Sequence, residues 1–223
     1  MITRLGMAPR RADMTTAGFL EHWRTSHADA AGQIPFLRRY AQLHPVLVDG
    51  VHAFGYPGFD ACSELEFGSV EDMDAGFASE TYQQAVRDDE EAFVDKRRFS
   101  MVLGHRERLS GERPDGGVRL LSFVRRHPAA TPEELDATLL DAYAAVIADD
   151  PVVRGHELLR PMGAERPGRE RDACDAVDYL DFPDGDTARS WAGSEAAVRA
   201  GLALAGSVFG VTRLLAHEHP VVG

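Results

Sequence analysis

Alternating hydrophobic and polar positions in short runs mark strands along the first half of the chain, and longer apolar-periodic stretches mark helices. The expected strands are Ile2–Ala8, Leu37–Leu47, Asp60–Phe67 and Ser100–Leu109. One expected helix is capped within Asp13–Thr16 and runs to about Ala31, where Gly32 can end it, and a second helical region covers about Val70–Asp95. The resulting order, β-α-β-β-α-β, is that of a ferredoxin-like unit, in which two helices pack on one face of a four-stranded antiparallel sheet.

The second half repeats this order. Its expected strands are Val118–Arg125, Val152–Pro161, Ala173–Phe182 and Phe209–Ala216, and its expected helices are Pro132–Ala148 and Asp186 to about Leu204. Individual residues also recur 116 positions apart (131−15 for the first pair): Thr15, Phe19 and Pro35 become Thr131, Leu135 and Pro151. Each sheet leaves one face open, so the two sheets are expected to pack face to face. The sequence therefore predicts an α+β fold of two tandem ferredoxin-like units, 1–110 and 117–223, that form an intramolecular dimeric α/β-barrel.

Charge and composition narrow the functional classes. The chain has 24 basic and 36 acidic residues, a formal charge of −12, so nucleic acid is not an expected partner. No apolar stretch approaches the length of a membrane span, and a cytoplasmic location is expected. Cys62 and Cys174 lie in different halves without metal-ligand spacing, and each is expected to be a small buried residue. The sequence has no Gly-rich phosphate loop and no Gly-x-Ser-x-Gly elbow, which disfavours nucleotide cofactors and serine hydrolysis.

A longer motif spans much of the first half. Phe19-Leu20-Glu21-His22-Trp23-Arg24-Thr25-Ser26-His27 is followed by Pro35-Phe36-Leu37-Arg38-Arg39-Tyr40 and by Gln42-Leu43-His44. These segments resemble the EthD branch of the dimeric α/β-barrel superfamily. The resemblance implies a cofactor-independent enzyme that isomerises, dehydrates or decarboxylates lactones or polyketide-like ring compounds. A methylmuconolactone isomerase branch uses one helix histidine and one loop histidine, and the matching positions here are His27 and His52.

The two histidines also have physical arguments of their own. Phe19, Trp23 and His27 are spaced four apart and share one helix face, so His27 is expected to point toward the sheet and could transfer protons near neutral pH. The alternative is that His27 only bonds the last carbonyls of its helix. His52 lies in the loop Val48–Phe59, which is longer than a hairpin needs and carries Phe54 and Tyr56, as a lid over an apolar ligand would. The alternative is a surface histidine.

Further residues are candidates for substrate binding. Trp23 and Tyr40 could form an apolar wall with a hydroxyl group, and strand alternation puts His44 on the face of Tyr40. Glu64, in the middle of a strand, could orient a histidine, although Glu66 shares its face and both could simply point outward. Ordinary core packing or incidental strand positions are the alternatives for all of these. In the second half, the loop residues Arg166, Arg169 and Arg171 could anchor a carboxylated substrate, against the alternative of a solvated charged loop.

We therefore predict a cofactor-free isomerase or lyase that acts on an unsaturated lactone or an aromatic, polyketide-like small molecule. One alternative is an oxidoreductase on the same barrel, either a cofactor-free monooxygenase or a haem protein whose axial ligand would be His127, His156, His217 or His219. Another is a non-catalytic ligand-binding or stress-response protein. His217 and His219 alternate on one strand, but no third ligand accompanies them and no metal site is expected. A homodimer is possible.

Overall fold

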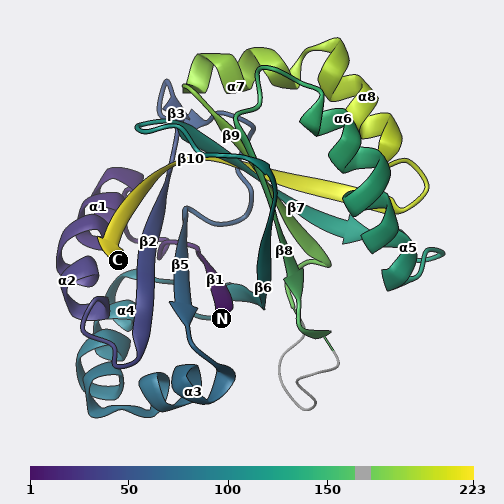
Figure 1. Ribbon diagram of the computed structural model, residues 1–223. Coiled ribbons are helices and arrows are strands. Elements are labelled where there is room, and N and C mark those ends of the chain that lie inside the picture. The colour runs from purple at the N-terminus through teal and green to yellow at the C-terminus, as the bar shows by residue number, and fades with distance from the viewer. Residues whose placement is uncertain (164–171) are drawn as a thin grey trace.

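Eight strands close into one antiparallel barrel, and helices cover its outside (Figure 1). The computed structural model describes residues 1–163 and 172–223. Around the barrel the strand order is β1-β5-β2-β10-β7-β9-β8-β6. The first half supplies β6-β1-β5-β2 and the second half supplies β10-β7-β9-β8, so each half contributes a four-stranded ferredoxin-like sheet. The predicted fold class is confirmed.

The strands of the barrel and the helices alternate along the chain as the hydrophobic pattern indicates. The barrel strands are β1 (Ile2–Ala8), β2 (Leu37–Pro45), β5 (Ala61–Phe67), β6 (Ser100–Gly111), β7 (Val118–Arg126), β8 (Gly155–Pro161), β9 (Ala176–Phe182) and β10 (Val208–Val222). The helical segments are α1 (Thr16–His22), η1 (Trp23–His27), α2 (Ala28–Ala31), α3 (Val70–Ala78), η2 (Thr81–Val86), α4 (Arg87–Phe93), α5 (Pro132–Ala137), η3 (Thr138–Tyr143), α6 (Ala144–Ala148), α7 (Gly185–Ala192) and α8 (Glu195–Ala203).

Two antiparallel seams join the halves. β10 pairs with β7 of its own half and then with β2 of the first half, which is why it runs beyond the expected end at Ala216 to Val222. β6 pairs with β8 in the same way and reaches Gly111. The two strands approach so closely there that a Cβ atom added at Gly104 would lie 2.0 Å from the carbonyl oxygen of Arg160. The division into domains 1–110 and 117–223 stays a prediction.

The helices differ from the sequence expectation in their interruptions. Three of them contain a π-helical turn, named η1, η2 and η3, in which hydrogen bonds close over five residues. The second helical region is interrupted at Ser79, where the backbone is extended and α3 ends before η2 begins. The last helical region is interrupted at Gly193, between α7 and α8. Thr15 and Thr131 cap equivalent helices through their side chains, as the repeat predicts.

The expected loop Val48–Phe59 contains a small hairpin. β3 (Leu47–Val48) pairs with β4 (Val51–His52) across the two-residue turn Asp49-Gly50, both with positive φ (52° and 79°). Asp-Gly is a preferred sequence for such a turn, and this signal was present in the sequence.

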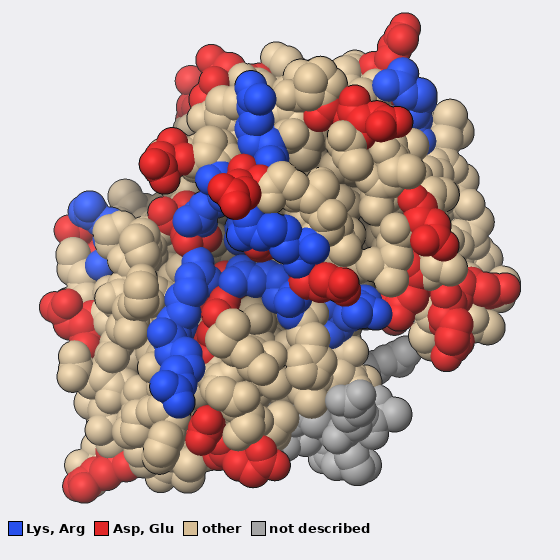
Figure 2. Space-filling view, in the orientation of Figure 1, with Lys and Arg blue, Asp and Glu red and all other residues tan. Residues whose placement is uncertain are grey.

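Apolar side chains fill the space between each sheet and its helices, and also one part of the barrel interior. The interior cluster includes Leu5, Leu43, Val102, Leu121 and Leu214. Both cysteines are buried and unpaired. No helix among the described residues is long and apolar enough to cross a membrane. On the face shown in Figure 2, Lys and Arg side chains gather near the centre and most Asp and Glu side chains lie toward the rim.

Candidate functional site

His27 lies in a cluster with one carboxylate and a second histidine. Its Nδ1 is 2.8 Å from Oδ2 of Asp89 on α4, and His22 Nε2 is 2.6 Å from Oδ1 of the same carboxylate. His22 and His27 are five residues apart, on nearly opposite sides of an ideal α-helix. The π turn η1 brings them to one side, because its hydrogen bonds also span five residues. The four-residue spacing of Phe19, Trp23 and His27 in the sequence does not predict that His22 and Asp89 are partners of His27.

The carboxylate of Asp89 is stabilised in its ionised form. Burial alone would raise its pKa, but hydrogen bonds from His27 and His22 outweigh burial and lower it. A carboxylate on Nδ1 fixes the orientation of the His27 ring, as in hydrolase triads. His27 is nevertheless 6% exposed, packs on Phe93 with ring centroids 5.0 Å apart, and lines neither of the two cavities described below. The contacts of His27 with Asp89 and Phe93 therefore join its own helix to α4.

Trp23, Tyr40 and His44 lie on the outer face of the first sheet, beneath its first helix, and not inside the barrel. Trp23 and Tyr40 are fully buried, and the side-chain amide of Gln42 donates to the Trp23 carbonyl oxygen (2.6 Å) and to Tyr40 Oη (3.0 Å). His44 bonds Gln42 Oε1 through Nε2 (2.9 Å), and its ring lies 4.7 Å from that of Trp23. Burial, with the nearby His219, Arg24 and His217, lowers the pKa of His44 to about 4. His44 is therefore neutral at physiological pH.

The hairpin that carries His52 crosses to the other half of the molecule. Ala53 and Phe54 pack against the hydrophobic core between the second sheet and its helices. The His52 ring meets Tyr56 edge-on at 5.5 Å, and burial lowers the pKa of His52. Tyr56 donates to Asp60 (3.0 Å). No hydrogen bond or ring contact between described residues joins His52 to His27, so the two predicted catalytic histidines are not shown to act on one substrate.

The second half contains a different polar centre in the equivalent place. Tyr143, which occupies the position of His27 shifted by 116 residues, donates to Asp178 Oδ2 at 2.7 Å. His156 Nε2 is 2.7 Å from Oδ1 of the same carboxylate. All three side chains are buried, Tyr143 at 5% exposure and the other two at 1%. His156 Nδ1 is buried without a hydrogen-bond partner. We call Tyr143, Asp178 and His156 the Asp178 centre.

A narrow cavity adjoins this centre between the second sheet and α8. It has a volume of about 20 Å³, enough for about one water molecule. Asp178, Tyr143 and Arg213 line it together with mostly small or apolar side chains, which include Ala197, Ala200, Leu139, Leu204, Val124 and Val211. Arg213 Nε is buried without a hydrogen-bond partner. Burial and the Asp178 charge raise the pKa of Tyr143 well above its ordinary value, so its phenol stays protonated and donates.

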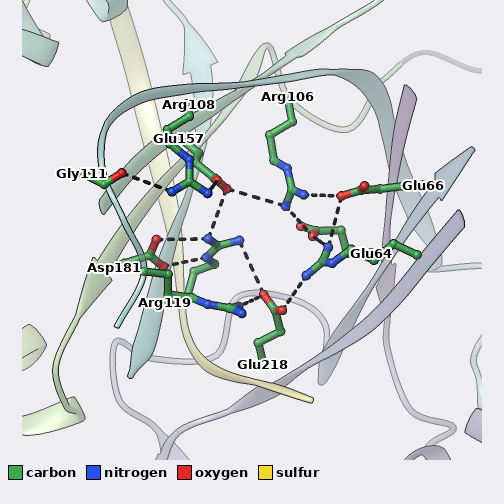
Figure 3. Close-up of polar contacts among 11 residues, drawn as sticks. Glu64, Glu66, Arg106, Arg108, Gly111, Arg119, Glu157, Asp181 and Glu218 are labelled. Carbon is green, nitrogen blue, oxygen red and sulfur yellow. Dashed lines mark hydrogen bonds and ion pairs between the residues drawn. The ribbon is translucent and has the colours of Figure 1, made fainter. Parts of the chain in front are cut away.

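Glu64 lies inside the barrel and contacts no histidine in the described contacts. Its Oε1 accepts from Arg39 and from Arg106, each at 2.5 Å, and Glu66 points inward beside it and bonds both arginines (Figure 3). Burial alone would raise the pKa of Glu64, but Arg106, Arg119 and Arg39 outweigh it and lower the pKa to about 2. The expectation that Glu64 orients a histidine, or simply points outward, is corrected. Alternation correctly predicts that Glu64 and Glu66 share one face of their strand. It does not predict which face points into the barrel, because helices cover the other face and both faces are enclosed.

These observations agree with the comparison with known families, which places residues 11–97 in the family described as EthD domain. The match makes the greater part of the first half similar to an EthD domain. No curated protein sequence matches the chain. The EthD match ends before β6 and covers neither the Asp178 centre nor its cavity.

Solved structures share the whole two-unit fold with this protein. An anthrone oxidase-like protein is 15% identical, with a TM-score of 0.65 over 99% of this chain and 93% of its own. A putative monooxygenase from Lactobacillus acidophilus is 11% identical, with a TM-score of 0.58 over 97% and 93%. A mutant chlorite dismutase from Candidatus Nitrospira defluvii is 11% identical, with a TM-score of 0.55 over 99% and 92%. At these identities the likeness establishes the fold alone.

The residues around His156 do not fit the haem alternative. Nε2 is engaged by Asp178, and His156 is not among the residues that line the adjoining cavity. Nor does any group of three His, Cys, Asp or Glu side chains stand ready to hold a metal ion in residues 1–163 and 172–223. Arg166, Arg169 and Arg171, the candidate carboxylate anchors, lie outside the described residues.

Proposed function

We propose that the protein is a proton-transfer enzyme, an isomerase or lyase, and that its substrate binds in the cavity beside the Asp178 centre. The observation that carries this proposal is a buried carboxylate with two hydrogen-bonding partners, Tyr143 and His156, at the wall of an otherwise largely apolar cavity. Buried titratable groups that converge on an apolar cavity are the usual mark of acid-base chemistry. The substrate class is a small, mostly apolar carbonyl compound such as an unsaturated lactone or a polyketide-like ring.

Each polar group at the cavity has a chemical role in this proposal. Asp178 accepts a proton from the carbon next to the substrate carbonyl, and the electron pair left behind becomes an enolate. Arg213 supplies an unpaired N–H to the enolate oxygen, which removes the cost of leaving that donor unbonded. Tyr143 and His156 hold the carboxylate in place, and the proton returns to a different carbon or helps a leaving group depart.

Substrate binding requires the cavity to widen. Its wall on the α8 side consists of Ala197, Ala200 and Gly201, which have little side chain to keep the helix in place. Gly201 is exposed, and a Cβ added there would meet no atom within 4 Å, so no neighbouring element holds the helix at this position. A shift of α8 away from the sheet would enlarge the cavity.

An oxidoreductase is the second candidate, favoured by the whole-chain structural likeness to a putative monooxygenase and an anthrone oxidase-like protein. It would use the same cavity and the same first step. The carbanion formed by Asp178 would add O₂ as co-substrate and take up a proton to give a hydroperoxide, which loses water and leaves a new carbonyl group on that carbon. The two candidates differ in oxygen uptake. The same set of substrates therefore tests both, with proton exchange and O₂ consumption measured separately.

The test compares two carboxylates, the buried Asp178 of the second half and the half-buried Asp89 of the first. Asp178→Asn and Asp89→Asn each remove a carboxylate charge that contacts two side chains, but only Asp178 lines the cavity. Both variants and the wild type are incubated in D₂O with unsaturated γ-lactones and with anthrone. Deuterium uptake is followed by NMR and O₂ by an electrode.

We expect wild-type exchange without O₂ uptake, at least about a 100-fold loss in Asp178→Asn, and near-normal rates in Asp89→Asn. Oxygen uptake that depends on Asp178 would support the oxidoreductase instead. A loss in Asp89→Asn and in His27→Ala, with Asp178→Asn active, would move the site to the EthD half, where His27 and His52 were predicted. Binding of these compounds without exchange or O₂ uptake would favour a non-catalytic ligand-binding protein.

A further inference from the structure

One end of the barrel interior is hollow and charged. The hollow has a volume of about 500 Å³, which is within the range of small-molecule sites. Its lining consists of Arg39, Arg106, Arg108, Glu112, Arg113, Arg119, Glu157 and Glu218. We call it the barrel mouth. It is built by strands of both halves and the linker between them, and it is separate from the cavity beside the Asp178 centre.

The charges at the barrel mouth are arranged in layers. The carboxylates of Glu64, Glu66, Glu157, Asp181 and Glu218 lie at the bottom, with side chains 0–9% exposed. The guanidinium groups of Arg39, Arg106, Arg108 and Arg113 lie above them, with side chains 17–51% exposed. Figure 3 shows Arg106, Arg108 and Arg119 turned toward the buried carboxylates across the barrel. Apart from Glu112 on the linker, solvent in the hollow therefore meets mainly arginines.

The buried carboxylates fix the positions of the arginines. Arg119 is held by both oxygens of Asp181, at 2.8 and 3.1 Å, and by Glu157 at 3.1 Å. Arg108 donates to Glu157 at 3.1 Å, and Arg113 pairs with Glu218 through Nη1. Each guanidinium carries five N–H groups, and these pairs use only part of them. The remaining donors on the exposed arginines are already oriented, which lowers the cost of binding an anion.

We propose that the barrel mouth binds a small organic anion with two or more carboxylate or phosphate groups. The five arginines of its lining are balanced in charge by the buried carboxylates beneath them, so it is the arrangement that favours an anion. Arg39, Arg106, Arg108 and Arg113 have side chains 17–51% exposed, whereas the buried carboxylates are 0–9% exposed. Planar guanidinium groups pair with carboxylates and phosphates through two parallel hydrogen bonds.

The test removes the two most exposed arginines of the mouth. Arg108→Gln/Arg113→Gln is compared with Arg24→Gln/Arg97→Gln, two surface arginines outside the mouth with side chains 53% and 94% exposed. Both doubles change the net charge equally, so a nonspecific effect of charge would act on both. Calorimetric titrations at low salt use citrate, pyrophosphate and, as a cationic probe, spermidine.

We expect wild type and the Arg24/Arg97 double variant to bind citrate or pyrophosphate with the same affinity, and the Arg108/Arg113 double variant to bind at least 10-fold more weakly. Citrate alone would identify a carboxylate site, and pyrophosphate alone a phosphate site. The proposal is overturned if neither anion binds at millimolar concentration, if both double variants weaken equally, or if spermidine binds in place of the anions. Thermal unfolding of each variant excludes loss of fold as the cause. None of these outcomes depends on the catalytic proposal, which concerns the other cavity.

Discussion

Tyr143 donates a 2.7 Å hydrogen bond to Asp178 on the neighbouring strand β9. His27, its counterpart in the first half, bonds Asp89 on a helix instead. An equivalent π turn presents each residue, so the two halves share this backbone but differ in the polar partner, a strand carboxylate in the second half and a helix carboxylate in the first. The narrow cavity adjoins the Tyr143–Asp178 pair, and this is the reason for placing the proposed chemistry in the second half.

Asp89 makes stability depend on acid pH. Its pKa in the folded protein is below the ordinary value of 3.8, so its contribution to the free energy of unfolding is complete above about pH 4 and is lost as pH falls through the lowered pKa. We expect Asp89→Asn to cost about 1.5–3 kcal/mol at pH 6, as for hydrogen bonds to a charged group, and to reduce the loss of stability in acid. Urea unfolding from pH 3 to 6 measures both. Asp29→Asn, at an exposed position, is the control, and equal stability of all three proteins at pH 6 would refute the prediction.

His44 also makes stability fall as pH decreases, but in a higher pH range than Asp89 does. Its pKa of about 4 is below the unfolded value of 6.5, so between these pH values the unfolded chain binds more protons and stability falls as pH decreases. We expect His44→Gln to flatten the pH dependence of unfolding between pH 4 and 6.5. In NMR titrations of the wild type, the His44 ring signals should stay constant from pH 8 to about 5. A midpoint near 6.5 would contradict the burial that the structure shows.

Gly201 offers a way to gain stability. It is exposed on α8, a Cβ there meets no atom within 4 Å, and alanine is favoured over glycine in a helix by about 0.8–1 kcal/mol. We expect Gly201→Ala to raise the melting temperature. Gly18→Ala in α1, where the Cβ would meet Thr15 Oγ1 at 3.2 Å, should stabilise less. An unchanged or lower melting temperature in Gly201→Ala would contradict this prediction.

Gly104 is needed for the seam between the halves. An added Cβ would lie 2.0 Å from the carbonyl oxygen of Arg160, so β6 and β8 would have to separate. We expect Gly104→Ala to lower the free energy of unfolding by at least about 2 kcal/mol, in the range of overpacked cores. Gly210→Ala on β10, with no atom within 4 Å of the added Cβ, should change it by no more than about 0.5 kcal/mol. Thermal and urea unfolding give both values.

The fold was predictable because its signals are local and are repeated. Strand alternation, the capping residues Thr15 and Thr131 and the 116-residue shift all lie within short segments, and the ferredoxin-like order follows from them. The breaks at Ser79 and Gly193 and the π turns were missed, since apolar periodicity continues across them. The Asp49-Gly50 hairpin had a readable signal that the loop interpretation passed over.

The candidate site was predictable only in its residue types. Histidines and acidic residues could be singled out, but their partners are 62 positions away for His27 and Asp89 and 35 for Tyr143 and Asp178. A one-residue change of helical pitch decides which side chains converge, and no local pattern records it. Glu64 shows the same limit, because its strand has both faces enclosed and only barrel closure makes one of them a ring of charges.

By itself, the sequence determined two ferredoxin-like units in tandem, an acidic chain and an EthD motif in the first half. Tertiary structure alone decided that five arginines meet the buried carboxylates at the barrel mouth and that a narrow cavity adjoins Asp178. The physical reason is range. Hydrophobic periodicity acts between near neighbours in the chain, whereas cavities and ion-pair networks form between residues that only the closed barrel brings into contact.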